Sequence, residues 1–309
     1  MKYRVWLKTL LSLALLAYLI VRYGLAIQLP EQTGQLLWLL PPLAITLFII
    51  PLLAGVRWNI FLQAVGIRLP FKAILSINFR SIFWGMLLPS SDGFALIRCF
   101  LAEKRVKARA GTATASVVAE KIVGMLCLGL VALLGSSFID NSSMSVMLRM
   151  FIVLYLLLIV AFLIWSSMYR GDPDPASGKI GKTICSIRAK LKQSLSLAPA
   201  LKALPWVLGL QFASIATTYF LFRYMGFTVP LKVHLCYLPV IQVLSLLPVS
   251  ISGFGIREGA FVFFYKAVCA NPPALITISV MSFVILTLVP AVIGGILSLL
   301  ERENLSRAA

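Results

Sequence analysis

Apolar stretches long enough to cross a lipid bilayer recur along the chain, and they limit what it can fold into. A transmembrane helix needs about 20 predominantly apolar residues. Only 12% of the 309 residues are charged, whereas a soluble domain averages about 25%. The longest polar interval, residues 169–202, is too short for a soluble domain of any size. The sequence therefore predicts an all-α polytopic membrane protein, with residues 1–309 forming a single integral membrane domain.

Apolar length predicts about six full spans and two shorter, interrupted pairs of helices. The full spans are expected at residues 5–21, 36–56, 111–138, 146–168, 204–222 and 275–300. The short pairs are expected at residues 71–88 with 94–109, and at residues 233–249 with 256–268. Each pair is broken in the middle by Pro, Ser and Gly, which interrupt a helix or satisfy its free backbone groups.

The distribution of Lys and Arg predicts how these segments are oriented, because basic residues accumulate in cytoplasmic loops. Basic residues mark the N-terminus, residues 57–72, residues 98–109, the loop 169–202 and the C-terminal tail as cytoplasmic. The first short pair begins and ends on one side only if it enters the membrane and returns. One full span follows the cytoplasmic loop 169–202 and one precedes the cytoplasmic C-terminal tail. The second pair must therefore enter the membrane from the opposite face and return to it. We therefore predict an inverted repeat of span–re-entrant hairpin–span units, at about 36–138 and about 204–300.

The formal net charge of +18 also comes from the Lys and Arg residues of these cytoplasmic loops. Basic loops meet anionic lipid headgroups, and no aromatic-and-basic RNA motif accompanies the charge. We expect no nucleic-acid partner.

Nearly the same phrase occurs in the middle of both short pairs. Residues 87–98 read LLPSSDGFALIR, and residues 246–258 read LLPVSISGFGIRE. In both phrases the Arg is the ninth residue after the Pro. Interrupted hydrophobic segments at corresponding places in two halves of a chain point to the binding site of a transporter.

The arginines of these two phrases, Arg98 and Arg257, are candidate ligands of a lipid phosphate. An Arg inside a bilayer is costly and therefore needs a partner or a purpose, and its planar fork suits phosphate. Backbone N–H groups at a helix start also bind anions, and the residues that would supply them are Gly93, Ser252, Gly253 and Gly255. The alternative is a structural role, in which each Arg caps a broken helix end or pairs with an acid. Arg98 has a further alternative as the start of the cytoplasmic basic cluster.

Three of the ten acidic residues lie where they would meet these arginines. Glu120 is predicted to pair with Arg98 or Arg257, to balance the charge of a basic cavity or to bind a coupling proton. A structural ion pair near the interface is the alternative for Glu120. Asp92 is interpreted as a cap of the following short helix, and Glu258 as a local cap or ion-pair partner.

Two other sets of polar residues are interpreted from their position in the apolar spans. Arg57 and Trp58, at the end of the second span, have the pattern of an interfacial anchor. Arg80 is predicted either to line a polar path or to snorkel.

Catalytic and metal-binding motifs are missing from the sequence. It contains no GxSxG, no HExxH and no Walker lysine loop, and these patterns are typical of several enzyme classes. The one His and the five Cys, which form no CxxC pair, predict neither a metal site nor a cofactor. The cysteines are interpreted as small core residues. We expect a protein that is not an enzyme.

Four motifs together resemble the lysylphosphatidylglycerol synthase transmembrane-region family, also called UPF0104. They are RW at 57–58, PSSDGFALIR at 89–98, ASVVAEKIVG at 115–124 and LPVSISGFGIREGA at 247–260. The resemblance implies a domain similar to the flippase part of multiple-peptide-resistance proteins, without the soluble synthase domain. The family motifs carry over onto Gly93, Arg98, Glu120, Gly253, Gly255, Arg257 and Glu258. The family commonly has Gly-Glu or Gly-Asp ahead of its first Arg, whereas this chain has Asp92-Gly93-Phe94.

These observations lead to two functional hypotheses. The first is a lipid transporter, or flippase, of the bacterial inner membrane, with both termini in the cytoplasm. It would move an anionic phospholipid or a polyprenyl-phosphate-type lipid between leaflets. The second is a non-transporting membrane partner or scaffold for a lipid-modifying synthase or glycosyltransferase. Membrane lipids are the expected partners in both cases.

Overall fold

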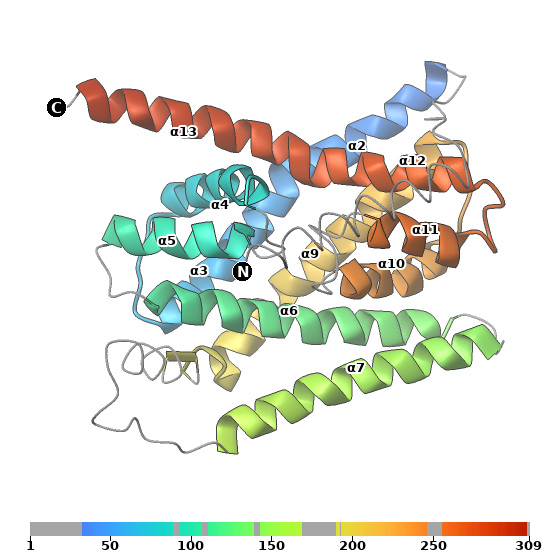
Figure 1. Cartoon of the computed structure of the whole chain (residues 1–309), viewed down its shortest axis with the longest axis horizontal. Helices are drawn as coiled ribbons and strands as arrows, with labels where there is room; N and C mark the ends of the chain where they lie inside the picture. Colours follow the sequence, from blue (N-terminus) through green and yellow to red (C-terminus); the bar gives the residue numbers. More distant parts are fainter. Residues whose placement is uncertain are drawn as a thin grey trace, which may run out of the picture.

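The computed structural model of the chain describes residues 33–88, 93–106, 111–138, 143–168, 190–191, 193–245 and 255–307. In these ranges it contains helices and turns and no strand (Figure 1). The helices, in chain order, are η1 (Thr33–Leu39), α2 (Leu40–Ala44), η2 (Ile45–Ile49), α3 (Ile50–Ala64), α4 (Phe71–Met86), α5 (Gly93–Val106), α6 (Thr112–Ser136), α7 (Ser143–Met168), α9 (Leu197–Tyr224), α10 (Leu231–Ser245), α11 (Ile256–Tyr265), α12 (Pro272–Phe283), η3 (Val284–Leu288) and α13 (Val289–Arg307).

Four continuous helical segments among the described residues are long and apolar enough to cross a bilayer. They are Gln35–Ala64, Thr112–Ser136, Leu197–Tyr224 and Pro272–Glu301. Helix α7, with 26 residues, packs along α6. The prediction of an all-helical polytopic membrane protein is confirmed, and the predicted span 5–21 lies outside the described residues. The first segment continues past residue 56 because Trp58, Phe61 and Leu62 are fully buried in the helix bundle.

Four helices are too short to cross a bilayer on their own, and they coincide with the two interrupted pairs expected from the sequence. Helices α4, α5, α10 and α11 contain 16, 14, 15 and 10 residues, below the about 20 that a span needs. Helix α4 packs against α5, which we call the first short pair, and α10 packs against α11, the second short pair. The links within the pairs, residues 89–92 and 246–254, lie outside the described residues.

Each short pair contacts the long helix of the other half of the chain. Helix α4 packs along α13, and α10 packs along α6. Figure 1 shows α12 and α13 along one side, α6 and α7 along the other, and the two short pairs between them. The two halves, η1 to α6 and α9 to α13, are therefore interlocked rather than placed side by side.

Both halves have an apolar core of their own. In the first half Trp58, Leu62 and Ile74 are completely buried among α3, α4 and the start of α6. In the second half Tyr265 and Leu275 are buried among α10, α11 and α12. Because lipid tails are as apolar as these side chains, the favourable contribution between helices in a bilayer is close van der Waals packing of such large groups.

The corner between α3 and α4 has the same geometry as the corner between α9 and α10. Each contains a glycine with positive φ, Gly66 at 82° and Gly226 at 80°, and each ends four residues later in a proline, Pro70 or Pro230. Glycine adopts this conformation without the steric cost that other residues meet.

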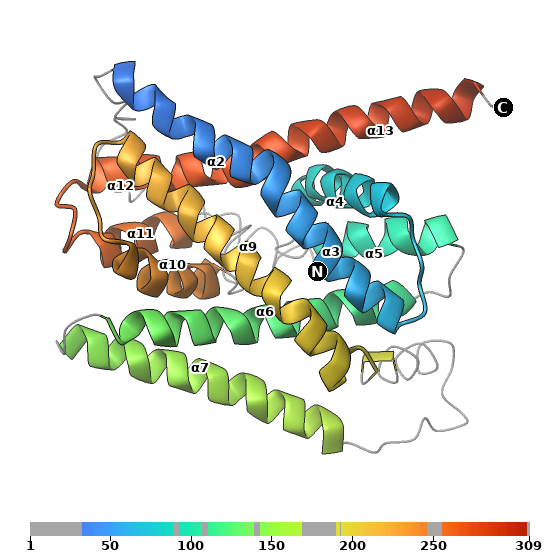
Figure 2. The same cartoon turned by 180° about the vertical axis from the view of Figure 1, so that it is seen from behind.

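The hydrogen bonds of the two corners also correspond. The N–H of Ile67 donates to the carbonyl oxygen of Leu62, and the N–H of Phe227 donates to that of Phe222, both at 2.9 Å. Helix α9 runs alongside η1 to α3 in the opposite direction, so the two corners lie at opposite ends of the molecule (Figure 2).

Glycines allow two of the contacts between the halves to be close. A β-carbon on Gly135 of α6 would lie 2.6 Å from the backbone nitrogen of Cys236 on α10. A β-carbon on Gly294 of α13 would overlap the carbonyl oxygen of Phe79 on α4. At both crossings the obstacle is backbone, which cannot rotate away as a flexible side chain can.

We therefore expect Gly135→Ala and Gly294→Ala each to destabilise the protein by about 1–3 kcal/mol, the usual cost of overpacking. Gly259→Ala on α11 is the matched control, because no atom lies within 4 Å of its β-carbon position, and alanine favours a helix. Unfolding midpoints of the purified variants in detergent measure the difference. Equal midpoints for all three variants would show that the crossings are not close.

Candidate functional site

A cavity of about 500 Å³ lies where the two halves meet, and the arginines of both repeated phrases line it. Helices α3, α5 and α6 of the first half and α9 to η3 of the second half contribute its wall. Most of the wall is apolar. Its charged and amide side chains are Arg57, Arg98, Glu120, Lys121, Gln211, Gln242 and Arg257.

Glu120 of α6 forms ion pairs with two arginines that come from different helices. One carboxylate oxygen contacts Arg57 of α3, and Oε2 lies 2.9 Å from Nη1 of Arg98 on α5. The side chains of Arg98 and Glu120 are each only 3% exposed. The hypothesis that Glu120 pairs with Arg98 therefore agrees with the geometry, and the carboxylate also neutralises a second cation.

The Arg98 guanidinium lies against an aromatic face but keeps free donors. Its central carbon is 3.9 Å from the centroid of the Trp58 ring, a cation–π geometry. Trp58 is fixed in turn by a 3.2 Å hydrogen bond from Nε1 to Oγ of Ser116. The Nε and Nη2 atoms of Arg98 are buried and have no hydrogen-bond partner among the described residues. Arg98 lines the cavity, but these two nitrogens themselves are buried within the protein.

The interpretation of Arg57 and Trp58 as an interfacial anchor is wrong. Trp58 is fully buried, and Arg57 lines the cavity, bound to Glu120. The sequence places both residues near the end of an apolar span, where anchors occur. It does not reveal that the helix continues to Ala64 and packs there against α6.

Arg257 is neutralised within its own helix. Its Nη2 lies 2.6 Å from Oε1 of Glu258, the next residue of α11. Glu258 is 1% exposed, and its Oε2 accepts a 2.7 Å hydrogen bond from the N–H of Gly255 at the helix start. Oγ of Ser279 on α12 accepts from Nε of Arg257 at 3.1 Å and donates to Glu258 at 3.2 Å. Glu258 therefore serves both as cap and as ion-pair partner.

The two arginine sites occupy matching positions in the two halves. Along the sequence, Arg257 follows Arg98 by the same number of residues as Ser279 follows Glu120. In the first half the Arg pairs with a carboxylate on the following long helix, and in the second half it bonds a hydroxyl there. Because Ser279 carries no charge, the carboxylate that neutralises Arg257 is that of Glu258. The residue at the corresponding position of the first half is Cys99. The two sites therefore have related geometry and different chemistry.

The remaining predicted site residues fall into two groups. Gly93 begins α5 and packs directly against Gly85 at the end of α4, and Gly255, with φ 83°, precedes α11. Asp92, Ser252 and Gly253 lie outside the described residues, so their predicted roles stay predictions.

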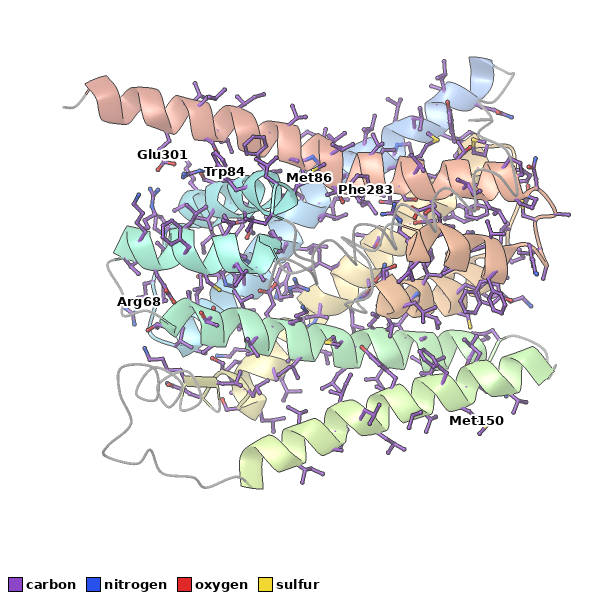
Figure 3. The ribbon with its side chains drawn as sticks, in the orientation of Figure 1. Arg68, Trp84, Met86, Met150, Phe283 and Glu301 are labelled. Carbon is purple, nitrogen blue, oxygen red and sulfur yellow. The ribbon has the colours of Figure 1, made fainter. Side chains whose placement is uncertain are left out.

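Among the described residues, positive charge exceeds negative charge around the cavity. Four cationic side chains line it, those of Arg57, Arg98, Lys121 and Arg257, together with the carboxylate of Glu120. Glu258 lies directly behind Arg257. Phe283, labelled in Figure 3, lines the cavity where α12 passes into η3, with its ring centroid 5.1 Å from the Arg257 guanidinium carbon. An anion with an apolar portion fits this combination.

Comparison with known families gives one match. The family model described as "Lysylphosphatidylglycerol synthase TM region" matches residues 5–294, nearly the whole chain. No curated protein and no solved structure matches the chain significantly.

The shared carboxylate predicts an order of stability among variants. We expect Glu120→Gln to cost about 3–5 kcal/mol, because it leaves two inward-facing guanidinium groups without their anion. Arg98→Met is expected to cost less, since Glu120 keeps Arg57 as partner. Glu301→Gln, at a 39% exposed carboxylate, is the control and should cost at most about 1 kcal/mol. Thermal unfolding of the purified variants gives the order, and a milder effect of Glu120→Gln than of Arg98→Met would contradict it.

Proposed function

The chain belongs to the lysylphosphatidylglycerol synthase transmembrane-region family, and we propose that it carries an anionic lipid between the leaflets of the bacterial inner membrane. The lipid is an anionic phospholipid or a polyprenyl-phosphate-type lipid, and it crosses without chemical change. Membership of a family of membrane domains that handle lipids supports the lipid as substrate. The phosphate-binding role of the arginines is our own inference from the cavity.

The observation that carries this proposal is that Arg98 and Arg257, one from each half, line the same cavity. A buried guanidinium donor without a partner is costly, and Arg98 has two such nitrogens. Phosphate oxygens accept hydrogen bonds from guanidinium groups in a bidentate geometry. A phosphate that enters the cavity would therefore offset the excess of positive charge, and the Arg98 side chain would have to turn toward it to donate these hydrogen bonds.

The size and composition of the cavity support the entry of a headgroup alone. Its volume of about 500 Å³ lies in the range of pockets that take a drug-sized molecule. The acyl chains stay in the bilayer, where they are already solvated. Only the polar headgroup needs a path, and Gln211 and Gln242 line the cavity with groups that both donate and accept.

The carboxylates hold the empty site together in this proposal. Glu120 balances Arg57 and Arg98, and Glu258 balances Arg257, while no phosphate is bound. When a phosphate arrives, the arginines exchange part of their contact with a carboxylate for contact with the phosphate. Both carboxylates are nearly fully buried, so each needs a cation beside it at every stage. An arginine that shares its donors between carboxylate and phosphate meets this need.

We further propose that the two halves form an inverted repeat in which each short pair re-enters the membrane from its own side. The support is threefold: the four helices are too short to span, the two corners have matching hydrogen bonds, and α3 and α9 run in opposite directions. Transporters with this architecture place their substrate site between the repeats.

Cysteine labelling tests this topology at two equivalent exposed positions. Arg68→Cys lies in the α3–α4 corner and Thr228→Cys in the α9–α10 corner. In a background that carries Cys185→Ser, the other four native cysteines are buried. An impermeant maleimide is added to cells with a permeabilised outer membrane. It should label the Thr228→Cys variant at once and the Arg68→Cys variant only after lysis. Labelling of both variants from one side would exclude the inverted arrangement.

Reconstituted vesicles test transport. We expect the wild-type protein to accelerate leaflet exchange of a fluorescent anionic lipid, and Arg257→Gln to reduce the rate at least about tenfold, because a charged hydrogen bond worth about 1.5–3 kcal/mol is lost. Arg68→Gln, an exposed cation outside the cavity, is the matched control and should transport normally.

Two outcomes would contradict this proposal. An unchanged rate for Arg257→Gln would remove this residue from the pathway. No exchange of any anionic lipid by the wild type would exclude transport and favour the role of a lipid-binding partner for a synthase or glycosyltransferase.

A further inference from the structure

A second pocket lies away from the central cavity, between α4, α5 and α13. Its volume is about 570 Å³, and it shares no lining residue with the central cavity. Helix α13 crosses α4 at Gly294 and continues past the short pair toward its C-terminal end (Figure 1). The polar residues that line the pocket are Arg80, Trp84, Lys104, Arg105, Ser298 and Glu301.

Three cations and one carboxylate face this pocket. Glu301 forms an ion pair with Arg80, and its Oε1 lies 3.6 Å from Nη1 of Arg105. Lys104 adds a third positive charge to the lining. Glu103, the acid of α5, faces elsewhere, because its Oε1 accepts a 2.9 Å hydrogen bond from the N–H of Ala113 at the start of α6. The pocket is therefore undersupplied with negative charge.

Arg80 is the most enclosed of the three cations. Its side chain is 16% exposed, whereas that of Arg105 is 46% exposed. The Nε of Arg80 is buried and has no hydrogen-bond partner among the described residues. Such a donor is expensive to leave unsatisfied, so the described residues alone leave the Arg80 guanidinium incompletely satisfied, and an anion in the pocket could contact only the 16% of the side chain that is exposed.

The rim of the pocket is amphipathic. Trp84 donates a 3.1 Å hydrogen bond from Nε1 to Oγ of Ser298, and both Trp84 and Glu301 lie below α13 in Figure 3. Phe100 lines the pocket and is 60% exposed, and Leu96, one turn earlier on α5, is 59% exposed. Tryptophan is typical of the level of the lipid headgroups, and exposed apolar side chains beside it suit acyl chains.

We propose that this pocket holds the phosphate group of a second, anionic lipid, and that Glu301 is a built-in carboxylate that competes with it. The phosphate lies among Arg80, Lys104 and Arg105, and its acyl chains lie along Leu96 and Phe100. Two negative charges can be accommodated, because the cations exceed Glu301 by two. The site is separate from the proposed transport path, so either can be wrong without the other.

A lipid fits this pocket better than free phosphate does, since phosphate alone would leave the exposed apolar surface of α5 uncovered. The same basic groups would attract both ions. Inorganic phosphate therefore belongs in the experiment as a competitor, and a zwitterionic lipid belongs there as the control for charge.

A fluorescent reporter inside the pocket makes the test local. Phe100→Cys, combined with Cys185→Ser, offers one accessible thiol, because Cys99, Cys127, Cys236 and Cys269 are buried. The full-length protein, labelled there with bimane in detergent, is titrated with phosphatidylglycerol that carries brominated acyl chains. Brominated phosphatidylcholine gives the baseline of non-specific quenching.

We expect saturable quenching by phosphatidylglycerol alone, and opposite effects of two substitutions. The double variant Arg80→Gln with Arg105→Gln should weaken binding at least about tenfold, since charged hydrogen bonds are lost. Glu301→Gln should tighten it about fivefold, because an exposed competing ion pair is removed. Arg68→Gln, an exposed cation outside both pockets, should leave the titration unchanged.

Three results would overturn the proposal. The first is equal quenching by the two lipids, and the second is a Glu301→Gln variant that binds no more tightly than wild type. The third is displacement of the lipid by an equal concentration of inorganic phosphate, which would make the pocket a site for the free ion.

Discussion

The carboxylate of Glu120 lies between the guanidinium groups of Arg57 and Arg98, inside a helix bundle that is otherwise largely apolar. A charge in such surroundings has to keep its partner, because an uncompensated buried charge costs several kcal/mol. The three residues come from α3, α5 and α6, so one interaction fixes the rotation of three helices at once. Trp58, stacked on Arg98 and bonded to Ser116, occupies the space behind the ion pairs. The rest of the cavity takes its shape from this fixed corner.

The second half meets the same constraint in a different way. Arg257 has its carboxylate on the adjacent residue, and Glu258 is itself held by the first turn of α11. The Ser279 hydroxyl and the ring of Phe283, whose centroid is 5.1 Å from the guanidinium carbon, tie this pair to α12. A shift of α11 against α12 therefore breaks hydrogen bonds but separates no opposite charges, whereas a shift of α5 against α6 separates Arg98 from Glu120.

The sequence predicted the helical membrane fold, the two short pairs and the two arginines, because apolar length and repeated letters are local signals. It also pointed to Glu120 as a partner of Arg98, since an acid in an apolar span needs a cation. It did not show that Arg57 is a second partner, because this depends on how α3 is rotated against α6. One further local signal was present: GIRLPFK at 66–72 and GFTVPLK at 226–232 mark the equivalent corners. Aligning the repeated phrases on their arginines, Arg98 and Arg257, would have placed Ser279 opposite Glu120. The pocket around Glu301 had no such signal, since it forms only where α13 crosses the other half.

Helix α5 connects the two sites physically. It carries Arg98 into the central cavity and, about two turns later, Arg105 into the outer pocket. Its short length and its packing against α4 mean that it moves, if at all, as part of the first short pair. Because α4 is in turn held against α13 at Gly294, a displacement of this pair toward the cavity would pull Arg80 and Arg105 away from Glu301. Residues of the same short helix, α5, thus line both the central cavity and the outer pocket.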